Sequence, residues 1–453
     1  MASSDQRLND LLAQLPTIAN NMYSEDEKVV FEAVKNVRVM LSFESAPPIQ
    51  QIIEAGLVPR MIQLVQFGGT ECQYEAGWAL TNIASGNPQQ TLVLVQSGAI
   101  PIFVEMLNSP IKKVAEQVLW CLGNIAGDSI DLRNLVLNNF AIENIIKLMH
   151  RNIQDVSLLR NVAWTFSNFC RGKPHPSKQH VDLFLPYLAK FLDATDQDIL
   201  VDTIWSFAFI TDTTSDWLIN AVIELNVIPR IMKYLGTNES VKLLVPSLRS
   251  VGNILSGNDV QTQYILNHGV IERFNELVTH PKANIRKEVV WSVSNITSGT
   301  RPQIQAIVDS GILKELTTRV IAKREQQDLL KEIMWALVNA STGGSITQLE
   351  YLVNINTIQS LMVVLREQYA SMYSLVLEGC ANLLNQDTNL PQCNIVRTFI
   401  DEDFRSVVQQ IQTEQPEEIE KFVQMLNNQD IMLKFWSSDD PLIEGLNQMN
   451  IDQ

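Results

Sequence analysis

The stretch Trp78-Ala79-Leu80-Thr81-Asn82-Ile83-Ala84-Ser85-Gly86 decides the fold, because its Trp-x-x-x-Asn pair returns at regular intervals along the 453-residue chain. The full set of pairs is Trp78/Asn82, Trp120/Asn124, Trp164/Asn168, Trp291/Asn295 and Trp335/Asn339, with the related pairs Trp205/Phe209 and Arg249/Asn253 between them. Neighbouring pairs lie 41 to 44 residues apart, and a period in this range is typical of stacked helical repeats. Residues four apart share one helix face, so each repeat adds a Trp and an Asn to one surface. We call this repeated series of paired positions the ladder.

Two glycine signals recur within each repeat. Gly-hydrophobic-Pro turns open an apolar segment at Gly56-Leu57-Val58-Pro59 and Gly98-Ala99-Ile100-Pro101, with weaker forms at Gly269 and Gly311. A second glycine follows each Trp/Asn pair, at Gly86, Gly127, Gly172, Gly257, Gly299 and Gly343-Gly344. Gly permits the positive φ that ends a helix, and Pro is tolerated in the first turn of the next one. Two stops per repeat predict three helices per repeat, which is the armadillo pattern.

The repeats define the domain organisation. We expect a non-basic lead-in at residues 1–28, an armadillo-repeat domain at 29–436 and an acidic, disordered tail at 437–453. A first repeat without Trp is expected at 29–68, a late one around Glu378-Gly379-Cys380-Ala381-Asn382, and a last helical pair at 400–436. Terminal repeats of a stack are usually atypical because they cap it.

Composition narrows the function classes. With 46% apolar and 19% charged residues the chain can bury a large helical core. Its five cysteines are scattered and form no CxxC pair, which favours reduced, mostly buried thiols. No stretch approaches the roughly 18 uninterrupted apolar residues of a membrane helix. The net charge is −16, of which residues 401–453 supply −9 with twelve acidic and three basic side chains. We therefore expect no membrane or nucleic-acid partner and favour a cationic one.

The Trp/Asn surface suits an extended, basic peptide. A Trp whose same-face neighbour is repeatedly Asn would bring an amide into the core, so an exposed face explains the pattern better than a buried one. Slots between successive indoles accept the stem and charge of Lys or Arg, while the Asn amides can hold the peptide backbone. The Asn row also fits hydrogen bonding between repeats or helix capping, and either use is compatible with ligand binding.

Carboxylates follow the same surface. Asp128 follows Asn124 by one turn, Asp212 holds the corresponding place after Phe209, and four more precede a ladder aromatic on its own helix face, namely Asp198, Asp202, Glu288 and Glu332. A single one is most simply a solvated side chain, but their repetition favours cation binding. Arg249 divides the row into two Trp-rich stretches. It can pair with nearby carboxylates or with an acidic group between two basic clusters of a ligand.

The segments Trp78–Gly86 and Trp120-Cys121-Leu122-Gly123-Asn124-Ile125-Ala126-Gly127-Asp128 closely resemble the importin-α (karyopherin-α) family. The likeness continues through Asn168–Gly172, Val251–Ile254, Trp291–Gly299 and Asn339–Gly344, and it covers roughly residues 29–435. It implies an all-α, right-handed superhelical armadillo-repeat solenoid of about ten three-helix repeats. It also implies a nuclear import adaptor that binds monopartite and bipartite basic nuclear localisation signals, extended along a concave Trp/Asn groove.

The resemblance further assigns residues to two peptide sites. A major site is implied at Trp78, Asn82, Ser85, Trp120, Asn124, Asp128, Trp164, Asn168, Asp202 and Trp205. A minor site is implied at Arg249, Asn253, Glu288, Trp291, Asn295, Glu332, Trp335 and Asn339. No metal and no cofactor is implied.

Three departures from the family pattern bear on function. Phe209 stands where the family usually has Tyr, and Asn258 replaces a common acidic residue. The family also carries a basic N-terminal arm that binds importin-β and folds back as a pseudo-substrate, whereas about 28 non-basic residues precede the first repeat here. The resemblance thus implies importin-β as a partner only for a chain with that arm. It implies an export receptor at the C-terminal repeats, a monomer, and shuttling between cytoplasm and nucleus.

Two other function classes compete with this interpretation. An armadillo scaffold of the β-catenin type, acting in adhesion or signalling, would bind other extended peptides, but such grooves favour acidic ligands through Lys and Arg rows. An enzyme is disfavoured because His150, His175, His180, His268 and His280 show no metal-ligand spacing. Gly343-Gly344-Ser345 lacks the Lys of a phosphate-binding loop. We expect the chain not to be an enzyme.

Overall fold

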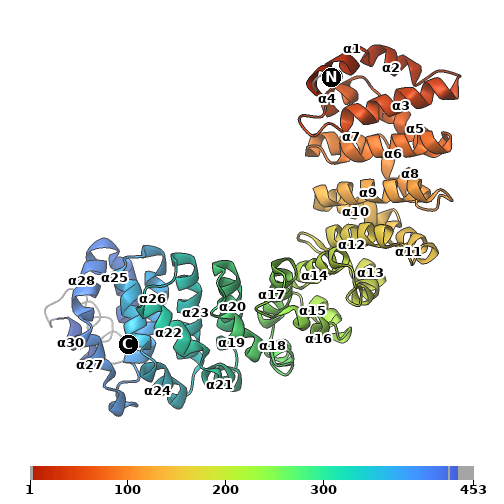
Figure 1. The fold of residues 1–453 in the computed structure, drawn as a ribbon. Helices are drawn as coiled ribbons and strands as arrows, with labels where there is room; N and C mark the ends of the chain where they lie inside the picture. The colour runs from red at the N-terminus through yellow and green to blue at the C-terminus, as the bar shows by residue number, and fades with distance from the viewer. Residues whose placement is uncertain (1–3, 427–428, 437–453) are drawn as a thin grey trace, which may run out of the picture. The chain divides into compact units, whose positions relative to one another are not determined.

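The computed structural model of the protein describes residues 4–426 and 429–436, and over these residues its regular structure is entirely helical (Figure 1). The predicted all-α class is therefore confirmed. The chain divides into two compact units, Met1–Ile210 and Thr211–Gln453. The acidic tail predicted at 437–453 lies outside the described residues.

The first unit contains the helices of the first five repeats, apart from the final residue of the last helix, Thr211, which belongs to the second unit. They are α1 (Ser4–Ala13), α2 (Leu15–Asn21), α3 (Glu27–Leu41), α4 (Ile49–Glu54), α5 (Val58–Phe67), α6 (Thr70–Ala84), α7 (Pro88–Gln96), α8 (Ala99–Met106), α9 (Lys112–Asp128), α10 (Ile130–Asn138), α11 (Ala141–Arg151), α12 (Val156–Cys170), α13 (Lys178–Phe191) and α14 (Gln197–Thr211). The predicted order of a short helix, an apolar helix and a long helix is clear in the triplets α4–α6, α7–α9 and α10–α12.

The second unit continues the same order. It contains α15 (Asp216–Glu224), α16 (Ile228–Ile231), η1 (Met232–Tyr234), α17 (Val241–Leu255), α18 (Asp259–Leu266), α19 (Val270–Leu277), α20 (Ala283–Thr297), α21 (Arg301–Ser310), α22 (Ile312–Ile321), α23 (Gln327–Gly343), α24 (Ile346–Asn354), α25 (Thr357–Arg366), η2 (Ala370–Met372), α26 (Tyr373–Leu384), η3 (Pro391–Cys393), α27 (Ile395–Asp401), α28 (Phe404–Glu414), α29 (Pro416–Met425) and α30 (Gln429–Phe435).

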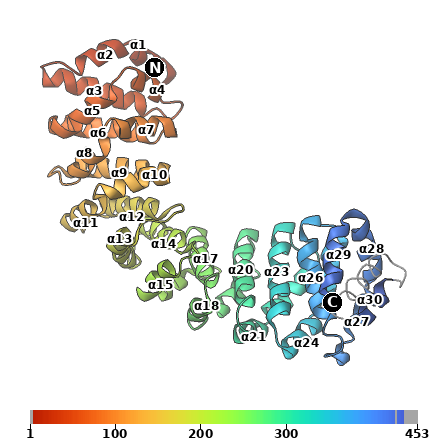
Figure 2. The same ribbon diagram turned by 180° about the vertical axis from the view of Figure 1, so that it is seen from behind.

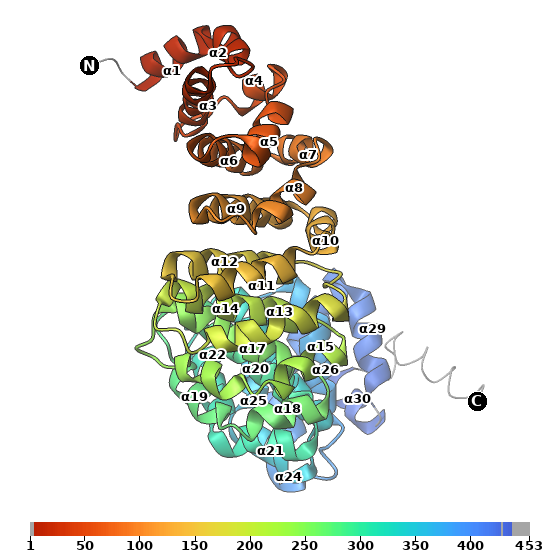
Figure 3. The same ribbon diagram turned by 90° about the vertical axis from the view of Figure 1, so that its right-hand side faces the viewer.

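The third helices of successive repeats pack directly on one another. In the first unit α3 contacts α6, α6 contacts α9 and α9 contacts α12; in the second, α17, α20, α23, α26 and α29 form the same kind of row (Figure 2). Figure 3 shows α6 and α9 on one side of the first unit, with the short helices α7 and α10 on the other. The row of third helices is the surface that carries the Trp and Asn residues.

The glycine turns predicted from the sequence lie at helix boundaries in the structure. Gly56, Gly98, Gly269 and Gly311 all have φ between 70° and 80°, the left-handed conformation that Gly adopts without a Cβ clash. At the end of the long helices the prediction is less accurate. Gly127 lies inside α9, which runs on to Asp128, so this glycine does not end its helix.

The fifth repeat departs from the predicted three helices, because it has only α13 and α14. Residues 171–177 between α12 and α13 contain Pro174 and Pro176, which lack the N–H needed to continue a helix. The fully buried Arg133 of α10 replaces the missing backbone bonds. Its guanidinium donates to the carbonyls of Arg171 at 2.9 Å and Pro174 at 2.6 Å.

The C-terminal end of the domain contains more helix than predicted. The last helical pair expected at 400–436 corresponds to α28 and α29, but α30 follows them. Phe404 contacts Phe422 and Phe435 with ring centroids 5.7 and 5.2 Å apart, and Trp436 is only 2% exposed. These aromatic side chains close the end of the hydrophobic core.

Candidate peptide-binding surface

All six ladder tryptophans are at least partly exposed to solvent. Trp120 and Trp335 are 46% and 42% exposed, and the other four, Trp78, Trp164, Trp205 and Trp291, are half-buried. Trp436, which is outside the ladder, is instead buried. Three ladder indoles of the first unit come from the neighbouring helices α6, α9 and α12, so their positions form a row along the surface.

Two of the indoles pack on glycine in the preceding repeat. A Cβ placed on Gly123 of α9 would lie 2.3 Å from Cζ3 of Trp164, and a Cβ on Gly252 of α17 would lie 2.5 Å from Cζ3 of Trp291. Both glycines directly precede the ladder Asn of their own repeat. Because glycine has no Cβ, each of these two positions leaves space for the indole of the next repeat.

The ladder asparagines bind the preceding repeat. Four of them donate an amide N–H to the carbonyl of the residue just before the previous ladder position, at 3.0 to 3.4 Å: Asn124 to Thr81, Asn168 to Gly123, Asn295 to Gly252 and Asn339 to Ser294. The other two donate to hydroxyls, Asn82 to Ser42 and Asn253 to Thr211. Hydrogen bonding between repeats, one of the alternatives open from sequence, is therefore present.

These bonds fix the orientation of each amide and leave part of it for a ligand. Asn82, Asn124, Asn295 and Asn339 are partly exposed. Asn168 and Asn253 are only 9% and 4% exposed, so the structure gives them a mainly structural position, although the resemblance implies ligand contact for both. Ser85 is exposed, and its hydroxyl donates to the carbonyl of Asn82.

Three ladder carboxylates are partly desolvated and make no ion pair within the part of the chain that the structure describes. Burial raises the pKa of Asp128 and of Glu332. Burial, with a contribution from the Asp198 charge, raises the pKa of Asp202 to about 6. A carboxylate in such a place gains more from an incoming cation than a solvated one does. Asp198 itself lies 3.6 Å from Arg160, and Asp212 is exposed.

Arg249 pairs within its own unit. Its guanidinium lies 2.5 Å from Glu288 and 5.3 Å from the ring centroid of Trp291. This is the first of the two roles that the sequence left open for it. Burial raises the pKa of Glu288, while Arg249 and Lys287 oppose the shift.

The first repeat contains a second arginine of this kind, which sequence reasoning missed. The Arg38 Nε lies 2.6 Å from Glu75, and its guanidinium carbon lies 4.5 Å from the ring centroid of Trp78. Arg38 and Ser42 occupy the Trp and Asn positions of the first repeat, and Glu75 precedes Trp78 by three residues as Glu288 precedes Trp291. That shared spacing was the available signal.

Two of the three departures noted in the sequence, Phe209 and Asn258, have defined contacts in the structure. Phe209 stacks on Trp205 of the same helix, with ring centroids 5.5 Å apart and planes 26° apart, so it extends the aromatic surface without a hydroxyl. Asn258 caps α18 and donates its side-chain amide to Asp216 at 3.0 Å.

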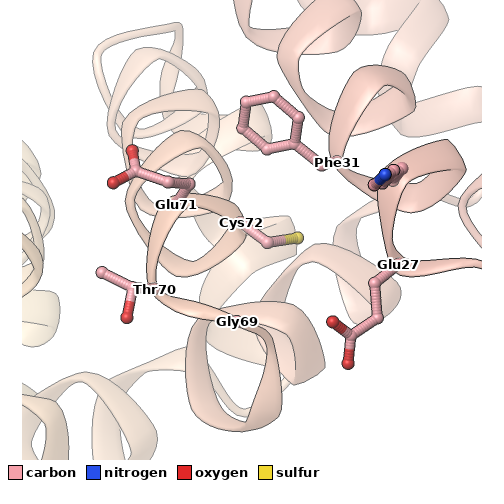
Figure 4. Close-up of a pocket in the computed structure, with 7 residues that line it drawn as sticks. Glu27, Phe31, Gly69, Thr70, Glu71 and Cys72 are labelled. Atoms are coloured by element: carbon pink, nitrogen blue, oxygen red, sulfur yellow. The ribbon is translucent and has the colours of Figure 1, made fainter.

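Other chemistry is sparse in the part of the chain that the structure describes. No cluster of metal-binding side chains occurs among residues 4–426 and 429–436, and none of the helices described there has the length and apolar character to cross a membrane. A cavity of about 340 Å³ lies between the N-terminal ends of α3 and α6, lined by Phe31 and Cys72 (Figure 4). Its lining residues precede Arg38 of α3 and Trp78 of α6 by about two helical turns, so none of them belongs to the Trp/Asn positions.

Comparison with known proteins identifies the repeats. The family model described as Armadillo/beta-catenin-like repeat matches residues 45–85, 87–127 and 258–298. A solved engineered protein of the Northeast Structural Genomics Consortium superimposes with a TM-score of 0.80, covering 91% of this chain and 97% of its own, at 22% identity. That similarity concerns the fold alone.

Sequence relatives are more specific. Importin subunit alpha-5 of Arabidopsis thaliana is 38% identical over 363 residues, covering 79% of this chain and 69% of that protein. Importin subunit alpha-1b of Oryza sativa subsp. japonica is 42% identical over 287 residues, covering 63% of this chain and 53% of that protein. The matches with the rice relatives thus span about half of their length. Armadillo repeats together with this identity show that the chain belongs to the importin-α family.

Proposed function

We propose that this protein is a nuclear import adaptor whose Trp/Asn surface binds Lys- and Arg-rich segments of cargo proteins in an extended conformation. The observation that carries the proposal is the combination of exposed indoles with desolvated carboxylates that pair with no described residue, all on the third helices of the repeats. Trp120 is 46% exposed on α9, and Asp128, two turns further along the same helix, has a pKa raised by burial. An aromatic face beside a carboxylate is the chemistry that recognises a cation on an aliphatic stem.

The asparagines support an extended ligand. Each amide is held by the preceding repeat, so a peptide backbone would meet side chains that are already oriented. The partly exposed Asn82, Asn124, Asn295 and Asn339 lie on four different third helices. A ligand that bonds to several of them must run across the helices rather than along one of them.

The family relationship supplies the biological setting of the proposal. A cargo adaptor that carries basic signals would shuttle between cytoplasm and nucleus. Importin-β would join it through a basic arm ahead of the repeats, where the protein has one. An export receptor would bind at the C-terminal repeats.

The test is a titration of a fluorescent Lys-Lys-Lys-Arg-Lys peptide at two salt concentrations. The parent should bind tightly and lose affinity as salt rises, because surface charges are screened. Asp128→Lys should bind at least tenfold more weakly. Asp131→Lys, at an exposed position on α10, is the charge-matched control and should differ little from the parent. A folded parent that does not bind the peptide would overturn the proposal and favour a scaffold for other peptides.

A further inference from the structure

The same arrangement of an arginine, a glutamate and a tryptophan occurs at the first Trp of each Trp-rich stretch. In the first unit an arginine at the ladder position, Arg38, pairs with Glu75 and covers the ring of Trp78, at 2.6 and 4.5 Å. In the second unit Arg249 pairs with Glu288 and covers Trp291, at 2.5 and 5.3 Å. The two arrangements come from different repeats and share the spacing of three residues between Glu and Trp, although the arginines lie 37 and 39 residues before their glutamates.

The contacts of each arginine are those that a basic ligand side chain would make. A guanidinium over an indole gains from the ring quadrupole, and its pairing with a carboxylate on the helix that carries the indole satisfies the charge. Arg38 and Glu75 are 18% and 12% exposed in their side chains, and Arg249 and Glu288 are 45% and 17% exposed. Little of the charge of the two carboxylates therefore remains available to a ligand.

We propose that Arg38 and Arg249 are internal occupants of the first cation slot beside each Trp-rich stretch, and that they fix where a bound cluster of basic side chains must end. This inference rests on the proposed function and specifies its register. In the first unit the open positions then begin beyond Trp78, where Asp128 and Asp202 have no ion pair with any described residue. In the second unit they begin beyond Trp291, where Glu332 is likewise without one.

Removing the arginine should open the slot. In Arg38→Ala the Glu75 carboxylate and the Trp78 ring are left for a ligand cation. A peptide with two extra lysines at one end should then gain more affinity, relative to the unextended peptide, than it gains with the parent. Both the N-terminally and the C-terminally extended peptide are needed, and the gain should appear for only one of them. We expect a three- to tenfold larger gain.

The experiment is a fluorescence titration of the full chain with Lys-Lys-Lys-Arg-Lys and its two extended forms, in a Trp335→Ala background that weakens the second stretch. Lys113→Ala is the matched control, because Lys113 also pairs with a carboxylate, Glu71 at 2.6 Å, and lies 5.1 Å from the Tyr74 ring, outside the ladder. It removes the same charge, so its extension gain should equal that of the parent. Adding Glu75→Gln to Arg38→Ala should abolish the gain.

Each outcome is decisive. An extension gain in Arg38→Ala no larger than that in Lys113→Ala would overturn the inference. If Arg38→Ala fails to fold, Arg249→Ala is tested with the same peptides, without the Trp335→Ala substitution. The side chain of Arg249 is 45% exposed, so its truncation disturbs less packing. Binding of the unextended peptide by the parent tests the proposed function alone, so the two failures are distinguishable.

Discussion

The Cα of Gly123 supports the indole of Trp164: a methyl group added at Gly123 would lie 2.3 Å from Cζ3 of that ring. The carbonyl of the same glycine accepts the amide N–H of Asn168 at 3.1 Å. One residue of the third repeat therefore positions both ladder residues of the fourth. The ladder is a set of contacts between repeats as much as a surface for a ligand.

Gly123→Ala should displace Trp164 and weaken peptide binding. No flexible side chain can yield at this contact, since the atoms met are those of the indole ring itself and Oγ1 of Thr165 at 2.9 Å. We expect a loss of about 1–3 kcal/mol in the free energy of unfolding, as for other overpacked sites, and a five- to twentyfold lower affinity for a basic peptide. Thermal unfolding and peptide titration measure the two effects.

Gly69→Ala is the control for that substitution. Gly69 has φ of −62°, and a Cβ there would meet no atom within 4 Å, so both stability and affinity should stay close to those of the parent. Equal peptide affinities for Gly123→Ala and Gly69→Ala would contradict the role assigned to Gly123.

Truncation of an exposed and of a buried tryptophan should have opposite effects. Trp120→Ala removes a side chain that is 46% exposed and should reduce peptide affinity at least tenfold, while the free energy of unfolding changes by less than about 1 kcal/mol. Trp436→Ala removes a buried side chain that packs against Phe422 and Phe435. It should cost about 3–5 kcal/mol of stability and leave peptide affinity nearly unchanged below the melting temperature. The reverse pattern would show that the ladder is part of the core.

Periodicity was sufficient to predict the repeat architecture, since the Trp/Asn spacing and the left-handed glycines both depend on local sequence. It could not predict the fifth repeat, whose first helix is absent. The prolines at 174 and 176 gave a signal, but the compensating residue, Arg133, lies 38 residues before the Arg171 carbonyl that it binds. A bond between repeats of this kind has no local sequence signature.

The candidate site, like the fold, was predictable from the sequence only where its features depend on local residues. The sequence identified the carboxylates in ladder phase, such as Asp202 and Glu332, because their position depends only on helix periodicity. It did not determine how the Asn168 amide is used, since its partner is a backbone carbonyl in another repeat. Arg38 was missed for a related reason: its role depends on Glu75 and Trp78 of the next repeat, which become its neighbours only when the repeats stack.

Arg133→Met should destabilise the first unit strongly. The substitution keeps an aliphatic stem but removes the donors to the Arg171 and Pro174 carbonyls, which would be left without those partners in a partly buried place. Loss of such partners costs about 1–3 kcal/mol for each group, and we expect the thermal midpoint of the protein to fall by several degrees. Arg151→Met is a suitable comparison. This arginine also donates to backbone carbonyls of another repeat, those of Leu107 and Asn108, but at a more exposed place, and its loss should cost less. An equal fall in the thermal midpoint of both variants would contradict the role assigned to Arg133 in holding the loop at residues 171–177.

Peptide affinity should rise as pH increases through about 6. Burial and the Asp198 charge raise the pKa of Asp202 to about 6 in the ligand-free protein, and a bound cation would lower it again by favouring the ionised form. Binding therefore releases a proton below that pH, and affinity should fall on acidification by up to about tenfold per unit of pKa change. The folding term has the opposite sign. The folded pKa lies above the ordinary value of roughly 3.9, so ionisation of Asp202 destabilises the ligand-free fold as pH rises.

Asp202→Asn should remove most of this dependence between pH 5 and 7, measured by fluorescence titration in buffers of constant ionic strength. Lys and Arg in the ligand keep their charge throughout that range, so the peptide contributes no slope of its own. Asp131→Asn at an exposed position should keep the slope of the parent. A slope that persists in Asp202→Asn would assign the pH dependence to another group, and a flat profile in the parent would mean that no ligand cation reaches Asp202.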